Sequence, residues 1–284
     1  MNIVLLAAVA LATASIAAQS IRRPFKSDPP IMCADCPAWN TDHEPFRIFG
    51  NAYYVGTERL SSILITSERG HILLDGALPQ SAELIDRHIR RLGFRTEDVK
   101  LIVNSHAHFD HAGGIHALQH ASGATVAASA SGARALRQGE PTAGDPQYGF
   151  GRQASEFPAV SKVRVVKDGE TLHVGTLSVT AHLTPGHTPG STTWTWKSCE
   201  ESGCLDLVYA DSLTATIAPG FTYSSDPARV AAFRRSIETV AALPCDIVIA
   251  VHPEFTNFAA KNGCRDYAQF GARSLDAQLA KEKK

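Results

Sequence analysis

The chain has no surplus of positive charge. Its 27 Lys and Arg residues stand against 28 Asp and Glu residues, which gives a formal net charge of -1 at pH 7. Nucleic acids and anionic membrane surfaces are bound through a concentrated positive field. The charge balance therefore argues against both kinds of partner and favours a small or neutral substrate.

Signatures of two other chemistries are also missing. No Gly-x-Ser-x-Gly sequence occurs, so nothing indicates a serine nucleophile. Cys33 and Cys36 form a Cys-x-x-Cys, which can be redox-active or bind zinc, but a zinc site of that type needs a second thiolate pair nearby. No second such pair exists, so a disulfide between Cys33 and Cys36 is the preferred interpretation.

Long hydrophobic segments are absent as well. Residues 1–20 carry no charged side chain, but their unbroken apolar run covers only residues 3–12, far short of the roughly 20 residues that cross a bilayer. Small residues follow, and Ser15-Ile16-Ala17, with Ala18 as an alternative end, predicts the cleavage site of a secretory signal peptide at 1–18. Because Lys and Arg are missing before the apolar run, a disordered segment or a buried N-terminal strand is the alternative.

The six cysteines agree with export, since an even number in a chain with a signal peptide indicates disulfides. They fall into three couples that are local in the sequence. Besides the first couple, Cys199 and Cys204 would close a short hairpin loop. Cys245 and Cys264 would tie the last strand to the last helix.

Hydrophobic periodicity predicts two halves of similar construction. The first half is expected to have strands at 46–49, 53–55, 62–66, 71–75 and 99–103 and helices at 81–92 and 110–119. The second half is expected to have strands at 162–166, 177–182, 192–197, 207–210 and 246–251 and helices at 227–243 and 265–279. A long loop would cover 139–158.

This order predicts an α/β protein built as an αββα sandwich of two similar halves. Each sheet must cover one face with helices and the other face with its partner sheet. The sandwich would form one domain at 46–284, after the signal peptide at 1–18 and an extended N-terminal segment at 19–45 that is rich in Pro, Asp and Cys.

The run from His106 to His111 places four potential metal ligands in six positions after an expected strand. Residues two apart in an extended segment lie on the same side, so His106 and His108 can face one ion together. Asp110 and His111 lie on the following turn and can face a second position beside it. Imidazole and carboxylate without cysteine suit zinc with an open coordination position.

Two more histidines follow strands in the same way. His187 lies in a loop rich in Gly and Pro, and His252 follows the apolar run 247–251. Three protein ligands plus solvent is the arrangement of a catalytic zinc, and two adjacent ions can share a hydroxide. The sequence thus predicts two ligand sets, one of His106, His108 and His187 and one of Asp110, His111 and His252.

The remaining histidines lack this clustering and are predicted to be surface or packing residues: His43, His71, His88, His116, His120, His173 and His182. Asp75 differs from them, because it ends an apolar strand. It could accept a hydrogen bond from a ligand imidazole or cap a helix, and the sequence leaves both interpretations open.

Together these residues resemble the metallo-β-lactamase superfamily. The resemblance covers nearly the whole chain from about Phe46 onward, and the six-residue histidine run is its most specific part. It implies the αββα fold and two zinc ions per chain. Its five features occur in the family's order: Asp75, the run 106–111, Gly186-His187, Ala210-Asp211-Ser212-Leu213 and His252.

The chain is most similar to subclass B3 of this superfamily. Ser212 stands where a related subclass has a cysteine ligand, and His111 directly after Asp110 is typical of B3. The cysteine couples 199–204 and 245–264 and the stretches 190–196 and 209–214 also look like B3 enzymes. The resemblance implies a periplasmic enzyme without nucleic-acid or obligate protein partner, free of the membrane after signal cleavage.

The implied activity is zinc-dependent hydrolysis of the β-lactam amide bond, including that of carbapenems, by attack of a zinc-bound hydroxide. Such an enzyme confers antibiotic resistance. Asp110 would be catalytic by orienting the hydroxide. Ser212, as a further catalytic residue, and Thr214 would bind the substrate carboxylate or a water, and Gln147 and Tyr148 could line the mouth; ordinary loop polarity is the alternative for these four.

Asp211 leaves a choice within the superfamily. In glyoxalase II-like and lactonase members an Asp at this strand end bridges both metals, whereas in B3 enzymes Ser212 faces the site. A change of one residue in the strand end swaps the two side chains. The alternatives are therefore a lactonase or a glyoxalase II-like thioesterase, against which export argues, and a metal-binding module without catalysis, against which the complete ligand set argues.

Overall fold

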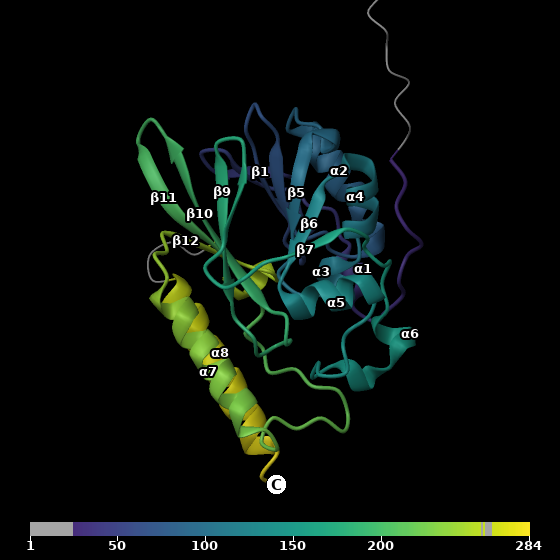
Figure 1. The fold of residues 1–284 in the computed structure, drawn as a ribbon, viewed down its shortest axis with the longest axis vertical. Coiled ribbons are helices and arrows are strands. Elements are labelled where there is room, and N and C mark those ends of the chain that lie inside the picture. The colour runs from purple at the N-terminus through teal and green to yellow at the C-terminus, as the bar shows by residue number, and fades with distance from the viewer. Residues whose placement is uncertain (1–24, 257, 259–262) are drawn as a thin grey trace, which may run out of the picture.

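Two β-sheets pack face to face between two outer layers of helices (Figure 1). The computed structural model describes residues 25–256, 258 and 263–284, so the signal peptide predicted at 1–18 lies outside the described residues. The predicted αββα sandwich is confirmed. None of the described helices combines the length and the apolar character that crossing a bilayer requires.

The first sheet has seven strands, which are neighbours in chain order: β1 (Phe46–Phe49), β2 (Ala52–Tyr54), β3 (Ile63–Ile65), β4 (His71–Leu74), β5 (Val99–Val103), β6 (Thr125–Ala128) and β7 (Val163–Val165). Strands β1 to β4 pair antiparallel, and β4 to β7 pair parallel. Parallel neighbours need crossover connections. These contain α2 (Ala82–Arg91), α4 (Ile115–Ser122) and α5 (Ala130–Gln138).

The second sheet has five strands in the order β12 (Ile247–Ala250), β11 (Gly203–Ala210), β10 (Thr192–Glu200), β9 (Leu177–Leu183) and β8 (Thr171–Val174). Only β11 and β12 pair parallel. Helices α7 (Pro227–Ala242) and α8 (Gly263–Lys281) cover its outer face (Figure 1). The shorter helices are α1 (Cys36–Trp39), α3 (Phe109–Ala112), α6 (Arg152–Ser155), η1 (Pro79–Ser81), η2 (Thr96–Asp98), η3 (Tyr148–Phe150) and η4 (Pro253–Phe255).

Buried apolar side chains form three layers, one between the sheets and one under each of the two helical layers. Strand β5 shows how one strand serves two of them. Leu101 and Val103 pack between the sheets, whereas Ile102 packs under the helices. Alternate side chains point to opposite faces, so a strand covered on both faces is apolar on both; in β5 only Lys100, near its start, is exposed.

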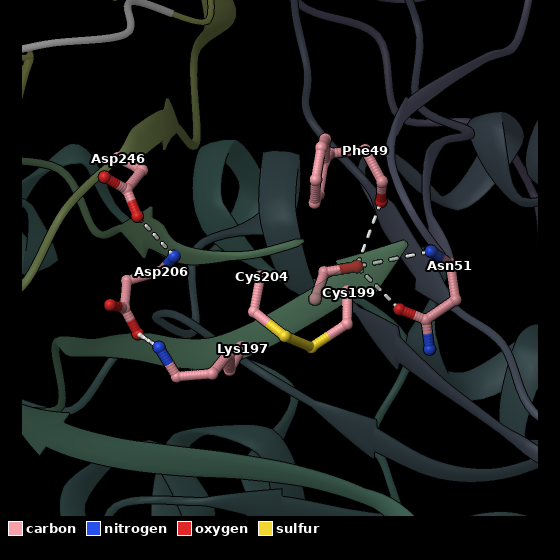
Figure 2. Close-up of a disulfide and its surroundings, with 8 residues drawn as sticks. Phe49, Asn51, Lys197, Cys199, Cys204, Asp206 and Asp246 are labelled. Carbon is pink, nitrogen blue, oxygen red and sulfur yellow. Dashed lines mark hydrogen bonds and ion pairs between the residues drawn. A yellow bond between two sulfur atoms is a disulfide. The ribbon is translucent and has the colours of Figure 1, made fainter. Parts of the chain in front are cut away.

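The structure joins all three cysteine couples as disulfides. The Cys199–Cys204 bridge links two directly paired residues of the β10–β11 hairpin (Figure 2). Beside it, Ser198 Oγ lies 3.0 Å from Phe49 O and 2.7 Å from Asn51 Oδ1. The hairpin of the second sheet is thereby attached to the β1–β2 turn of the first.

One predicted helix is wrong in its extent. The helix expected at 110–119 is divided into α3 and α4 at Gly113 and Gly114. A Cβ on Gly114 would lie 2.2 Å from Gly76 O. The chain after β4 therefore passes directly against this bend, and α3 is left as a separate turn that carries Asp110 and His111.

Candidate metal centre

The loops that follow β5, β9, β11 and β12 meet at one edge of the sandwich. The loop after β5 carries His106 and His108, and α3 continues it with Asp110 and His111. The other two loops with histidines deliver His187 after β9 and His252 after β12. Ring centroids of neighbouring histidines are 4.4–5.1 Å apart. Asp110 Oδ2 lies 3.2 Å from His111 Nε2, so the structure brings all six predicted ligands together.

Gly186 is needed beside His187 because of helix α7. A Cβ at this position would lie 2.1 Å from the Phe233 ring. Phe233 is fully buried in the outer core layer. The close approach of loop and helix fixes the backbone from which His187 reaches the cluster.

In the first cluster, His106, His108 and His187 offer ligand atoms that all lie within 4.8 Å of one another. One nitrogen of each ring is already engaged. His106 Nδ1 donates to Asp211 Oδ1 at 2.6 Å, and His187 Nδ1 donates to Thr214 O at 2.9 Å. In His108 the other ring nitrogen is engaged, because its Nε2 lies 3.1 Å from both carboxylate oxygens of Asp145.

The nitrogens that remain for a metal are therefore Nε2 of His106, Nε2 of His187 and Nδ1 of His108. His106 Nε2 is buried and has no hydrogen-bond partner among the described residues. Burial and the neighbouring His106 and His108 lower the pKa of His187 to about 3. Burial also lowers the pKa of His106 well below its usual value. Both rings are thus neutral, the form that binds a cation.

The second cluster is a nearly regular triangle. Asp110 Oδ2 lies 3.2 Å from His111 Nε2 and 3.4 Å from His252 Nε2, and the two nitrogens are 3.2 Å apart. Tetrahedral ligands with bonds of about 2.0–2.1 Å are about 3.3–3.4 Å from one another. Burial by itself would raise the pKa of Asp110, but His111 and His252 hold it well below its ordinary value.

These observations fit zinc. An unpartnered buried nitrogen is costly unless something binds it, and His106 Nε2 faces the cluster of free ring nitrogens. The donors are imidazole nitrogens and a carboxylate without thiolate, which suits zinc in a catalytic rather than a structural site.

Within the described part of the chain, Asp75 neither accepts a hydrogen bond from a ligand imidazole nor caps a helix, the two roles that its sequence left open. Its carboxylate accepts hydrogen bonds from Asn104 Nδ2, Ser105 N, Ser105 Oγ and Tyr209 OH at 2.5–2.9 Å. Asp75 has φ 57°, a left-handed conformation that Asp tolerates, and it fixes the two residues before His106.

Asp145 is a residue of the site that the sequence did not reveal. Besides His108 Nε2, its carboxylate accepts the backbone N–H of Gln147 at 2.8 Å. The same group therefore orients a ring of the first cluster and holds the long loop against it. Nothing in the local sequence distinguishes Asp145 from a solvated loop residue.

The clusters open into a cleft of about 350 Å³, a volume in the range of small-molecule sites. Gln147, predicted at the mouth, lines it together with Ser212 and Thr214, and Ser212 Oγ lies 3.0 Å from Thr214 Oγ1. Gln147 Nε2 lies 3.3 Å from His187 Nε2. Tyr148, by contrast, is 49% exposed and does not line the cleft. The turn η3 places Phe150 there instead.

The N-terminal segment also contributes to the cleft, which its sequence did not indicate. Asp35, just before α1, and Trp39, the last residue of α1, are among the lining residues. The Trp39 ring lies 5.7 Å from the His252 ring and 6.1 Å from the Phe109 ring. The histidines predicted to be structural, from His43 to His182, belong to neither cluster among the described residues.

Comparison with known proteins agrees with this geometry. The family model described as metallo-beta-lactamase superfamily matches residues 55–252. The solved structure of Rm3 metallo-beta-lactamase is 46% identical, covers 89% of this chain and 100% of its own, and has a TM-score of 0.86. MEM-A1, a subclass B3 metallo-beta-lactamase from a soil metagenome library, is 48% identical over 86% of this chain and 98% of its own, with a TM-score of 0.83. Metallo-beta-lactamase SMB-1 bound to 2-mercaptoethanesulfonate is 44% identical over 86% of this chain and 99% of its own, also with a TM-score of 0.83.

Proposed function

This chain belongs to the metallo-beta-lactamase superfamily and is a hydrolase, and from that premise we propose that it opens the β-lactam amide bond as a two-zinc enzyme of subclass B3. The observation that carries the proposal is the triangle of Asp110, His111 and His252 beside the three-histidine cluster. One cluster would hold one ion only. Two adjacent clusters of three ligands each supply a two-zinc site.

The first zinc would be held by His106, His108 and His187 and the second by Asp110, His111 and His252. When bound, the ions would polarise the substrate carbonyl and lower the pKa of water. The protein's part is to hold the ligands in place. Asp211, Asp145 and the Thr214 carbonyl fix the three rings of the first cluster by engaging the nitrogen opposite the free one.

Two kinds of side chain remain for the substrate. The hydroxyls of Ser212 and Thr214 form a hydrogen-bonded pair at the end of β11 and can bind the ring carboxylate. The Gln147 amide, held over His187 by the loop, can donate to a carbonyl oxygen. Asp110 has an ionised carboxylate and can orient an attacking water.

The position of Asp211 disfavours the lactonase and glyoxalase II-like alternatives. A metal-bridging Asp would have to lie between the two clusters. Asp211 Oδ1 bonds His106 Nδ1, on the side of the ring away from its free Nε2. This contact supports a role in holding His106.

The proposal is tested by substrate turnover. We expect the purified, zinc-loaded chain to hydrolyse a carbapenem and a penicillin, followed by the loss of β-lactam absorbance. Dialysis against a chelator should reduce the rate to background, and added zinc should restore it. Failure to turn over any class of β-lactam would contradict the proposal.

Replacing His252 with Ala tests the second zinc. We expect kcat/KM to fall by about a hundredfold or more, because the triangle loses one of its three ligands. Bound zinc, measured by atomic absorption, should fall from two ions per chain to one. The control is His173→Ala, an exposed histidine on β8. Hydrolysis by the His252 variant at the wild-type rate would show that the two-site assignment is wrong.

We also propose a periplasmic location, which depends on the signal peptide predicted at 1–18. Fractionation of cells that express the full chain, together with the N-terminal sequence of the mature protein, checks it. The expected mature chain begins near residue 19.

A further inference from the structure

The cleft carries carboxylates and aromatic rings at one end and hydroxyls at the other. Trp39 and Phe255 contact His252, with ring centroids 5.7 and 5.8 Å from its ring. Asp35, whose carbonyl accepts from Trp39 N one turn later, and Glu254, next to Phe255 in η4, also line the cleft. Thr214, at the other end, contacts His187. Neither lysine nor arginine occurs among the described residues that line the cleft.

Asp35 is not used by its own helix. It occupies the N-cap position of α1, where Asp commonly accepts a backbone N–H, yet its side chain makes no capping hydrogen bond. Asp35 is exposed and is one of the residues that line the cleft. Glu254 is less available, because Arg59 lies 4.0 Å from it.

The segment that carries Asp35 is firmly attached to the domain. The Cys33–Cys36 disulfide closes its turn. Thr57 Oγ1 donates to Trp39 O at 2.5 Å, and Asp42 bonds the buried His88 at 2.7 Å. The position of this segment at the cleft is therefore built into the fold.

From this arrangement, and resting on the proposed function, we infer that Asp35, Glu254, Trp39 and Phe255 form a subsite for a cationic substituent of the β-lactam. A cation is attracted by aromatic faces and by a nearby carboxylate. Because the ring carboxylate of the substrate would lie at Ser212 and Thr214, the cation belongs on the opposite part of the molecule, the acylamino side chain. The chain should thus prefer substrates with an ammonium group there and disfavour those with a second carboxylate.

Three penicillins test this, since they differ only at the α-carbon of a phenylacetyl side chain. Ampicillin carries an ammonium group, benzylpenicillin a hydrogen and carbenicillin a carboxylate. At about pH 6.5 an α-amino group, with a pKa of about 7.7–8.0, is protonated. We expect kcat/KM to decrease from ampicillin to benzylpenicillin to carbenicillin, mainly because KM rises. The preference should weaken at high salt, which screens exposed charges.

The decisive variant is Asp35→Asn, which keeps the size of the side chain. It should reduce the ampicillin-to-carbenicillin ratio of kcat/KM by about three- to tenfold, with benzylpenicillin nearly unchanged. Glu201→Gln, an exposed site at the tip of the β10–β11 hairpin, is the matched control and should leave the ratio unchanged. An equal ratio in Asp35→Asn and wild type at low salt would overturn the inference.

A second measurement separates this inference from the proposed function. Trp39 is half-buried, whereas Trp194 and Trp196 are buried, so fluorescence quenching reports on Trp39. We expect Asp35→Asn to weaken quenching by the cation N-methylpyridinium and strengthen quenching by iodide, with neutral acrylamide unaffected. If none of the penicillins is hydrolysed, the proposed function fails. The subsite is then tested only by the quenching of Trp39 fluorescence. Equal quenching by the cation in both proteins would then overturn it.

Discussion

Replacing His187 with Ala should lower kcat/KM for a β-lactam by at least about a thousandfold, which corresponds to about 4 kcal/mol of transition-state stabilisation. The substitution removes one of three nitrogens that lie within 4.8 Å of one another. His106 and His108 alone would bind zinc weakly, since a catalytic zinc needs three protein ligands. Steady-state kinetics with zinc added at increasing concentration, together with zinc content, measures the loss.

The fold should survive this change, which makes the result interpretable. The engaged nitrogen of His187 contacts only Thr214, by its carbonyl and its hydroxyl. Gly186, whose contact with Phe233 fixes the loop, is untouched. His182→Ala, on strand β9 just before the loop that carries His187, is the matched control: it loses one hydrogen bond to Thr195 and should keep its activity. Near-normal activity and full zinc content in the His187 variant would remove this residue from the ligand set.

The metal cluster could be predicted from the sequence because its ligands follow apolar strands. A strand such as 247–251 is visible as an apolar run, and the residue after it, His252, must emerge at a sheet edge. The end of β5 delivers His106 in the same way. Ligand-type side chains directly after several strands therefore predict that these side chains meet at one edge of the sheets.

Residues that approach the cluster from irregular segments could not be predicted. Asp145 lies in a long loop, and Asp35 and Trp39 lie in a segment without periodicity. Their positions depend on contacts between distant parts of the chain, such as Thr57 with Trp39. Local pattern carries no information on such contacts.

The missed elements have a similar explanation. Strand β6 has only four residues, Thr-Val-Ala-Ala, of which alanine favours helices. It becomes a strand because β5 and β7 pair with it on both sides. Helix α5 begins with Ala-Ser-Gly, and its start is fixed by Ser129, whose side chain accepts from Gly132 N. Pairing with distant strands thus determines β6, and a side-chain cap determines where α5 begins.

Replacing Asp75 with Ala should destabilise the protein by about 4 kcal/mol, measured by urea unfolding of the metal-free protein. Four hydrogen bonds would be lost in a fully buried position. Asn104 Nδ2 and Tyr209 OH would each keep a second acceptor, His106 O and Ser61 O. Each unsatisfied donor costs about 1–3 kcal/mol. The sum of these costs overstates the loss. Burial raises the pKa of Asp75 to about 6, so the ionised carboxylate costs the folded protein about 3 kcal/mol at neutral pH. The Ala variant does not carry that cost.

The pH dependence separates this explanation from a simple loss of packing. The pKa of Asp75 is raised from 3.8 in the unfolded chain to about 6 in the folded one, so its protonated form favours folding. The stability that Asp75 contributes is then fully present below about pH 4 and decreases as pH rises through 6. Wild type should therefore exceed Asp75→Ala by more at pH 4 than at pH 7. Tyr209→Phe, which removes one of the donors and keeps the carboxylate, should cost only about 1–2 kcal/mol. Because the Tyr209 hydrogen bond lowers the pKa of Asp75, this variant should keep the decrease in stability between pH 4 and pH 7 and make it somewhat larger. A difference between wild type and Asp75→Ala that does not change with pH would mean that the buried carboxylate is not the cause.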